Sequence, residues 1–308
     1  MKSALAWRRI DGVLLLDKPE GATSNHILQR ARRLLRAEKA GHLGTLDPFA
    51  SGLLPIAFGE ATKLSRFSLE ADKTYQATLR LGETTATGDP EGEMITRCDE
   101  QALFSITREN VEASLSRFLG TQKQIPPKYS ALKYQGRNYY DYARAGIDIP
   151  RKERDIEVFS LTLIEFSLPY VVIDVKVSKG AYIRVLAEDI GNDLGVGAYL
   201  TALRRTRSGM FDLSRAYSLA TLETMNDDER FSCLLPADVL TATLPRVVLT
   251  PELAARFRHG QRINLREVDL PLTAQLPMCS VYAGEELVGI AEARQGALRP
   301  LRILQEKT

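Results

Sequence analysis

GHLGTLDPFASGLL, residues 41–54, is the stretch that best decides how the chain folds and what it does. It holds three glycines and a single aspartate, Asp47, which precedes Pro48. Glycine permits φ > 0 and close backbone approach, and Pro48 disfavours the α region for the residue before it. The pattern predicts a stiff, non-helical turn that holds one carboxylate in place. Such a turn suits a reacting carboxylate, and it also suits an ordinary tight turn, because Asp, Gly and Pro are common turn residues.

The fixed positions of this stretch read G-H-x-G-x-L-D-P-x-A-x-G-x-L. They resemble the catalytic motif of the TruB-type tRNA pseudouridine synthases, and every fixed position of that pattern is present. The resemblance implies that Asp47 is a nucleophile and that His42 fills the space left by a base flipped out of the RNA. It further implies isomerisation of the T-loop uridine of tRNA, conventionally U55, with the T-stem and loop as the partner RNA.

Three later motifs follow in the family's order and extend the resemblance over about residues 10–215. They are DKTY at 72–75, SKGAYIRVLAEDIG at 178–191 and GAYLTALRRTRSG at 197–209. The resemblance implies that Tyr75 stacks on the target uracil and that Arg184 pairs with the catalytic aspartate. It also implies that Tyr182 lines the uracil pocket and that the backbone of Leu203 touches the base.

The implied reaction moves uracil from an N-glycosidic to a C-glycosidic link, which needs no redox change and no energy donor. This agrees with a sequence that lacks a P-loop and a GxGxxG motif. A carboxylate can serve as the nucleophile if it is ionised. Burial would raise the pKa of Asp47, and a bidentate guanidinium from Arg184 would oppose that rise. Whether Asp47 attacks the ribose or the uracil ring stays open.

The 308 residues are 44% hydrophobic and 26% charged, which are ordinary values for a globular protein. The net charge of +2 does not by itself indicate a nucleic-acid-binding protein, because local patches of cations bind phosphates. No apolar run reaches the roughly 18 residues of a membrane span. Cys98, Cys233 and Cys279 are odd in number and lack CxxC spacing, which disfavours a disulfide framework or a cysteine zinc site. We expect a cytoplasmic monomer without metal, cofactor or membrane contact.

Periodicity and resemblance together predict an α/β catalytic domain on a mixed sheet over residues 1–240. A small PUA-like β domain is expected over 246–308, with a helix after Thr250 and strands near 279–283, 287–291 and 297–304. In the first domain the expected strands are 10–17, 73–81, 156–166 and 171–178, and the expected helices are 24–35, 60–69, 107–119 and 183–194. Val111, Leu115, Phe118 and Leu119 should face inward, 83–99 should be a loop, and 221–240 a connector.

Residues 121–154 interleave five tyrosines with lysines and arginines. Cations meet phosphates and aromatic faces stack on bases, so this composition suits RNA. The segment resembles the RNA-gripping insertion, or thumb, of the family, and Lys128, Lys133 and Arg137 are its candidate phosphate contacts. We expect the thumb to be mobile in the free protein and ordered over bound RNA. A helical packing stripe is the plainer explanation of Tyr139 and Tyr142.

Other cations leave two interpretations open. Lys18, at the end of the first strand, is either a surface charge or a residue that faces the active site and binds substrate. Arg204 and Arg205 form a basic cluster with Arg207 that either binds RNA or is solvated. The arginines at 30–36 are either solvated or form a phosphate-facing stripe.

Three other functions remain to be weighed against the synthase. A non-catalytic RNA-binding protein on the same scaffold is disfavoured by the joint presence of Asp47, Tyr75 and Arg184. A guide-RNA-dependent relative is disfavoured by the near-neutral charge and the separate thumb. A hydrolytic N-glycosidase would share much of the site and would release free uracil.

Overall fold

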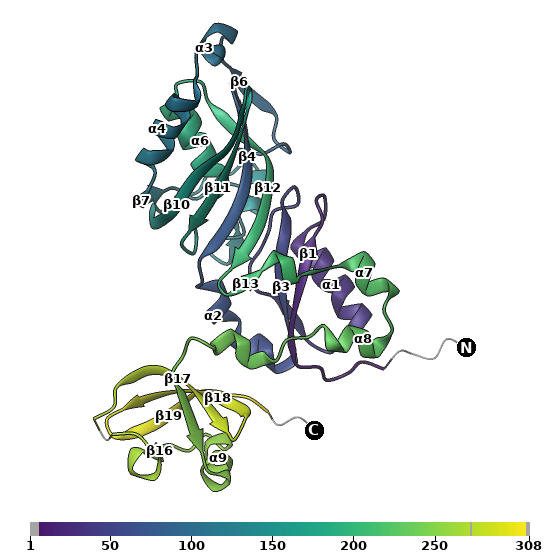
Figure 1. Cartoon of the computed structure of the whole chain (residues 1–308), viewed down its shortest axis with the longest axis vertical. Helices are drawn as coiled ribbons and strands as arrows, with labels where there is room; N and C mark the ends of the chain where they lie inside the picture. The colour runs from purple at the N-terminus through teal and green to yellow at the C-terminus, as the bar shows by residue number, and fades with distance from the viewer. Residues whose placement is uncertain (1–5, 272, 306–308) are drawn as a thin grey trace.

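The computed structural model describes residues 6–271 and 273–305. They form a ten-stranded mixed sheet with helices and, at the C-terminal end of the chain, a smaller unit built on a five-stranded sheet (Figure 1). The α/β fold class predicted from the sequence is therefore confirmed.

The large sheet is continuous through eight strands, and two short strands pair at its side. In spatial order the eight are β14 (Tyr217–Ser218), β1 (Gly12–Lys18), β3 (Ser51–Phe58), β12 (Ala198–Ser208), β4 (Lys73–Leu81), β11 (Tyr170–Val177), β10 (Arg154–Ser167) and β7 (Gly120–Gln124). β2 (Ala40–His42) pairs with β3, and β13 (Phe211–Asp212) pairs with β12. β1 runs parallel to β14, β12 runs parallel to β3, and the remaining pairs are antiparallel.

Helices cover the sheet in two groups, which Figure 1 separates. Near β4, β11 and β10 lie α4 (Arg108–Arg117) and α6 (Ile183–Asp193), over a core that includes Ala77, Leu79 and Ile190. Near β1 and β3 lie α1 (Ser24–Leu35), α7 (Leu219–Thr224) and α8 (Asp227–Ser232). The alternation in β4 and the helices predicted at 24–35 and 183–194 are confirmed. The apolar residues that recur with period 2 in β4 and period 3.6 in the helices lie on the faces that these elements bury.

Several local predictions were wrong. Residues 83–99 contain a hairpin of β5 (Glu83–Thr85) and β6 (Met94–Arg97), held by cross-strand pairs that its polar composition concealed. α3 (Glu100–Phe104) follows it. The helix expected at 60–69 is split into a 3₁₀ turn, η1 (Gly59–Leu64), and α2 (Ser65–Leu69). Leu119 is 45% exposed because α4 ends before it.

The segment at 221–240 is more than a connector. Leu222 of α7 is buried against the α1 side of the sheet, and acidic residues of α7 and α8 pair with arginines in and just after α1. η3 (Ala237–Thr241) then leads toward the C-terminal unit, and η2 (Leu213–Arg215) precedes β14.

The C-terminal unit has the strand order β15–β17–β18–β19–β16. These are β15 (Arg246–Leu249), β17 (Leu276–Ala283), β18 (Glu286–Arg294), β19 (Ala297–Ile303) and β16 (Ile263–Asn264), with α9 (Pro251–Arg258) and the 3₁₀ turn η4 (Leu265–Glu267). Thr250 caps α9 as its sequence predicts. Ile290 and Leu304 join a buried cluster with Leu43 and Leu64 of the large unit, so the proposed division at 240–246 stays a prediction.

The thumb segment contains a small hairpin, β8 (Lys133–Tyr134) and β9 (Arg137–Asn138), followed by α5 (Tyr139–Arg144). Tyr139 is buried, and the Tyr142 hydroxyl donates to the carbonyl of Tyr134 at 3.1 Å. The tyrosines therefore help to pack the segment itself. Its expected mobility in the free protein stays a prediction.

Gly191 gives a test of how α6 packs on β12. A Cβ on Gly191 would lie 2.2 Å from the amide nitrogen of Ala198, which belongs to backbone that has no room to move. Gly191→Ala should therefore lower the free energy of unfolding by about 2–3 kcal/mol, because overpacking outweighs the gain in helix propensity of up to about 1 kcal/mol. Chemical denaturation measures this, with the exposed Asn192→Ala on the same helix as the control. A stabilised Gly191→Ala would contradict the packing.

Candidate active site

The Asp47 turn lies between β2 and β3 and is fixed from both sides by hydrogen bonds. The Ser24 hydroxyl, at the start of α1, accepts from the amide of Leu46 at 2.8 Å and donates to its carbonyl at 2.9 Å. The carbonyl of Pro48 accepts from the amide of Gly21 at 2.9 Å. The carboxylate of Asp47 is thus held by its backbone on a turn that has little freedom.

Lys18 is a buried cation that hydrogen-bonds to the backbone of this turn. Its side chain is fully buried, and its ammonium donates to the carbonyls of Pro19, Ala22 and Pro48 at 2.9, 2.6 and 3.1 Å. Burial lowers the pKa of Lys18 to about 8, and the charge of Asp47 opposes the shift. The surface-charge interpretation is wrong. The predicted substrate contact stays a prediction, and the ammonium already donates to three protein carbonyls.

Arg205 is a second buried cation beside the turn. It is 1% exposed and donates to the carbonyls of Leu53, Gly44 and Thr45 at 2.7, 3.1 and 3.4 Å. A Cβ on Gly52 would lie 2.4 Å from the Arg205 carbonyl, so β3 and β12 approach closely only because glycine stands there. The prediction that Arg205 binds RNA as a surface cation is therefore wrong. Its guanidinium instead ties the turn to the sheet.

Arg204 points to the opposite face of β12, as strand alternation requires. Its guanidinium pairs with Asp17 at 2.6 Å and donates to the Ser51 hydroxyl at 3.3 Å, with 40% of the side chain exposed. Arg204 thus remains accessible for a phosphate contact, and that role stays a prediction.

Arg184, in the first turn of α6, joins the parts of the site. Its Nε lies 3.1 Å from a carboxylate oxygen of Asp47, while its Nη1 lies 3.0 Å from Asp89. Nη1 also donates to the carbonyl of Thr87 at 3.1 Å, and Nη2 donates to that of Tyr129 at 2.7 Å. The predicted pairing of Arg184 with Asp47 is present. The predicted bidentate grip is not, because the guanidinium distributes its N–H groups over four partners.

A cavity of about 320 Å³ opens beside these charges. Six predicted site residues line it: Asp47, Tyr75, Tyr182, Arg184, Leu203 and Arg205. Four motifs that are far apart in the sequence therefore converge on one space. The aromatic rings and Leu203 supply apolar surface, and the ion pair supplies charge, which is the usual composition of a ligand site.

His42 lies on β2 just before the turn. Its Nδ1 is buried and has no hydrogen-bond partner among the described residues. Burial lowers the pKa of His42, and the nearby charge of Arg205 lowers it further. The ring is therefore held neutral, which suits a space-filling role more than a cationic one.

The pKa of Asp47 is raised by burial, which is the largest influence on it. Arg184 lowers that pKa, Asp89 raises it and Lys18 lowers it. The carboxylate side chain is still 36% exposed, whereas that of Arg184 is 5% exposed. The site therefore sets desolvation, which raises the pKa of Asp47, against two cations that lower it.

Sequence reasoning missed three residues of the site. Asp89 is the buried second carboxylate on Arg184, Lys73 lines the cavity, and Ser130 projects into it from the thumb. Lys73 stands in the DKTY motif and was available as a signal. Asp89 and Ser130 lie in irregular segments, where no periodicity marks an inward side chain.

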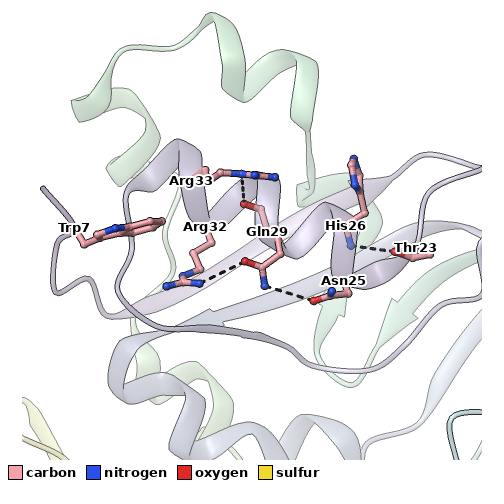
Figure 2. A pocket seen from close by; sticks show the side chains of 7 residues that line it. All are labelled: Trp7, Thr23, Asn25, His26, Gln29, Arg32 and Arg33. Atoms are coloured by element: carbon pink, nitrogen blue, oxygen red, sulfur yellow. Dashed lines mark hydrogen bonds between the residues drawn. The ribbon is translucent and has the colours of Figure 1, made fainter. Parts of the chain in front are cut away.

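A separate hollow runs along α1 and bears on the arginines at 30–36. Figure 2 shows Arg32 beside Trp7, with its guanidinium 4.7 Å from the ring centroid. Arg30 pairs with Glu223 and Arg36 with Asp227. These arginines therefore have partners within the protein, which favours the structural interpretation of the stripe. The hollow contains none of the residues that converge at Asp47.

Among the described residues, no group of three or more His, Cys, Asp or Glu side chains is placed to hold a metal ion. Within residues 6–271 and 273–305, no helix is long and apolar enough to span a membrane.

Comparison with known proteins identifies the class of enzyme to which this fold and site belong. Residues 32–183 match the family described as "TruB family pseudouridylate synthase (N terminal domain)". Residues 184–242 match the "tRNA pseudouridylate synthase B C-terminal domain", and residues 245–304 match "Pseudouridine synthase II TruB, C-terminal".

Individual relatives are similar over nearly the whole chain. "tRNA pseudouridine synthase B" of Burkholderia mallei (strain NCTC 10247) is 51% identical, over 97% of this chain and 99% of that protein. The protein of the same name from Thiobacillus denitrificans is 50% identical over 97% of each chain. A solved chain in "Crystal Structure of a Cbf5-Nop10-Gar1 Complex" is 26% identical with a TM-score of 0.70, over 96% of this chain and 84% of that one. The chain belongs to the TruB family of pseudouridylate synthases.

Asp89 gives a pH test of the electrostatics. Asp89→Asn removes a negative charge that raises the pKa of Asp47, so that pKa should fall. The acid limb of the rate profile should then move to lower pH, because Asp47 stays ionised further into acid. The plateau rate should also fall, roughly tenfold, because Arg184 loses a buried partner. Single-turnover rates of pseudouridine formation against pH measure both, with the exposed Glu93→Gln as control. An acid limb moved to higher pH would contradict the assignment.

Arg184 gives a second test, based on geometry at constant charge. Arg184→Lys retains the cation but lacks the planar fork that reaches four partners, so the turnover rate should fall by roughly a hundredfold or more. Arg117→Lys, on an exposed pair with Asp193, serves as the matched control and should retain its rate. Full activity of the Arg184 variant would mean that Arg184 does not orient Asp47.

Proposed function

We propose that this chain isomerises the T-loop uridine of tRNA, U55, to pseudouridine with Asp47 as the nucleophile. The single observation that carries the proposal is the 3.1 Å ion pair of Asp47 with the buried Arg184 at a cavity lined by Tyr75 and Tyr182. The names of relatives that are 50–51% identical over nearly the full chain support tRNA as the substrate.

The cavity lies inside the protein, so the target base has to leave the RNA stack to reach it, at a cost of a few kcal/mol. Tyr75 can hold the extruded uracil by its ring face, Tyr182 and Leu203 enclose it, and His42 fills the space vacated in the RNA. A neutral histidine is compatible with that last role.

The chemistry changes C–O, C–N, C–C, C–H and N–H bonds, and each bond that forms is matched by one that breaks. Asp47 attacks either the ribose C1′ or the uracil C6, the bond from N1 to C1′ breaks, and the detached uracil rotates. C5 then bonds to C1′, the C–O bond to Asp47 breaks and restores the free carboxylate, the proton on C5 leaves to a base, and N1 takes up a proton. Product and substrate are isomers, so the reaction as written consumes no cofactor.

Two other functions would use the same scaffold. A non-catalytic RNA-binding protein would not need the balance of desolvation and charge that surrounds Asp47. A guide-RNA-dependent enzyme would assemble with further proteins, whereas the relatives at 50–51% identity are named as tRNA synthases. We propose a free-standing, monomeric, cytoplasmic enzyme without a metal or cofactor.

The nucleophile is tested by Asp47→Asn. The change is nearly isosteric and removes the charge, so turnover should be lost while affinity for tRNA stays within about threefold. Pseudouridine mapping on an unmodified tRNA transcript measures turnover, and filter binding measures affinity. The exposed Asp228→Asn is the control. Near-normal turnover, after deamidation back to aspartate has been excluded, would overturn the assignment. Abasic RNA with free uracil as the product would identify a glycosidase instead.

The proposed RNA-binding role of the thumb is tested by the salt dependence of tRNA affinity. Lys128 pairs with Asp148 at 2.9 Å, Arg137 lies 4.9 Å from the Tyr142 ring centroid, and Lys133 is exposed. If these cations neutralise phosphates, replacing all three with alanine should reduce the slope of log affinity against log salt by up to about three contacts. Single-turnover rates at saturating RNA should change much less.

A charge-matched triple variant outside the thumb, at Arg97, Arg108 and Arg117, controls for net charge. An unchanged slope in the thumb variant would show that its cations only solvate the surface. The thumb would then have to be withdrawn as an RNA-binding element.

A further inference from the structure

Ser130, on the thumb, carries a buried hydroxyl that the fold leaves without a hydrogen bond of good geometry among the described residues. The residue is 6% exposed and lines the cavity together with Asp47 and Tyr75. Its Oγ is buried and has no hydrogen-bond partner of good geometry among the described residues. Burying an unpaired hydroxyl costs stability, so such a group in a ligand cavity points to a partner that the ligand supplies.

The position of this hydroxyl is fixed by the backbone on both sides. The carbonyl of Tyr129 accepts from Nη2 of Arg184 at 2.7 Å, and the carbonyl of Ser130 accepts from the amide of Tyr140 at 3.3 Å. The amide of Tyr139 donates to Leu132 at 2.8 Å. Ser130 is therefore held over the cavity by the same guanidinium that orients Asp47.

The neighbouring cations have little hydrogen-bonding capacity left for a base. Lys73 donates to the carbonyls of Ser68, Leu69 and Ala71 at 3.1, 2.9 and 2.5 Å. Arg205 is likewise engaged with three carbonyls. Uracil presents two carbonyl oxygens and one N–H along its polar edge. An enclosed uracil therefore needs hydrogen-bond donors from the protein more than acceptors. A hydroxyl can supply one without adding charge.

Tyr182 is the neighbour that competes for this hydroxyl. Burial raises the pKa of Tyr182, and its interaction with Ser130 lowers that pKa in part. Because a phenol both donates and accepts, the two groups can exchange partners when a ligand enters.

We propose that the Ser130 hydroxyl donates a hydrogen bond to a carbonyl oxygen of the flipped uracil, so that the thumb completes the base-recognition site. This rests on the proposed function. It assigns to the thumb a contact with the reacting base in addition to its contacts with the RNA backbone. Rejection of bases that lack an acceptor at that position would follow.

The test combines one variant with three RNAs. Ser130→Ala and wild type are compared in single-turnover kcat/KM on a tRNA transcript with uridine, 2-thiouridine or 4-thiouridine at the target position. Sulfur is the weaker acceptor, so it removes the proposed bond from the substrate side. On uridine, Ser130→Ala should lose about tenfold, because the base is enclosed with an unpaired oxygen. On one of the two thio-RNAs that loss should shrink to within about twofold.

Ser208→Ala is the matched control. Ser208 also carries a buried hydroxyl without a partner in the described chain, but it does not line this cavity. Both variants should unfold close to the wild-type temperature, because neither hydroxyl has a hydrogen bond of good geometry among the described residues, and only Ser130→Ala should lose rate. Should Ser130→Ala fold poorly, Ser130→Gly and the wild-type rates on the thio-RNAs provide the same comparison.

The proposal is overturned if Ser130→Ala retains wild-type kcat/KM on uridine, or if its loss is equal on all three RNAs. An equal loss would mean that Ser130 acts only by packing. Absence of pseudouridine with wild-type protein on the uridine transcript would instead reject the proposed function itself, so the two failures are distinguishable.

Discussion

The buried guanidinium of Arg184 is the contact on which the site depends. At the start of α6 it contacts three segments that are far apart in the sequence. Its partners are Asp47 in the turn before β3, Asp89 in the β5–β6 hairpin and the Tyr129 carbonyl in the thumb. A charge that is only 5% exposed would be costly without such partners. The cation and its neighbours therefore require each other: the carboxylates offset its desolvation, and it offsets the rise in the pKa of Asp47.

Two more buried cations lie around the turn, and backbone carbonyls stabilise them in place of carboxylates. Lys18 and Arg205 are almost completely buried and use their donors on carbonyls of the turn and of β3. A carbonyl in a turn has no strand or helix partner of its own, so a buried cation satisfies several at once. The cost is a lowered pKa for Lys18, to about 8. The benefit is a carboxylate, that of Asp47, whose backbone is fixed without the regular structure that would bury it.

The sequence predicted the centre of this arrangement better than its surroundings. Asp47, Tyr75, Tyr182 and Arg184 stand in motifs with fixed spacing, and they meet at one cavity. Arg205 was assigned wrongly because adjacent arginines were treated as one cluster. Strand alternation sends Arg204 and Arg205 to opposite faces, which the buried Leu203 in the same strand could have signalled. Asp89 lies beyond such reasoning, since its burial depends on a distant helix.

The hydrogen bond from Arg184 to the Tyr129 carbonyl links the thumb to the charges around Asp47. Tyr129 offers its carbonyl, so this contact survives any side chain at that position, and only the path of the backbone matters. Movement of the thumb away from the cavity would free one N–H of Arg184 and withdraw Ser130 together. The charge balance at Asp47 would then change at the moment when the base loses its enclosure. A single backbone hydrogen bond thus connects the guanidinium beside Asp47 to the position of the thumb.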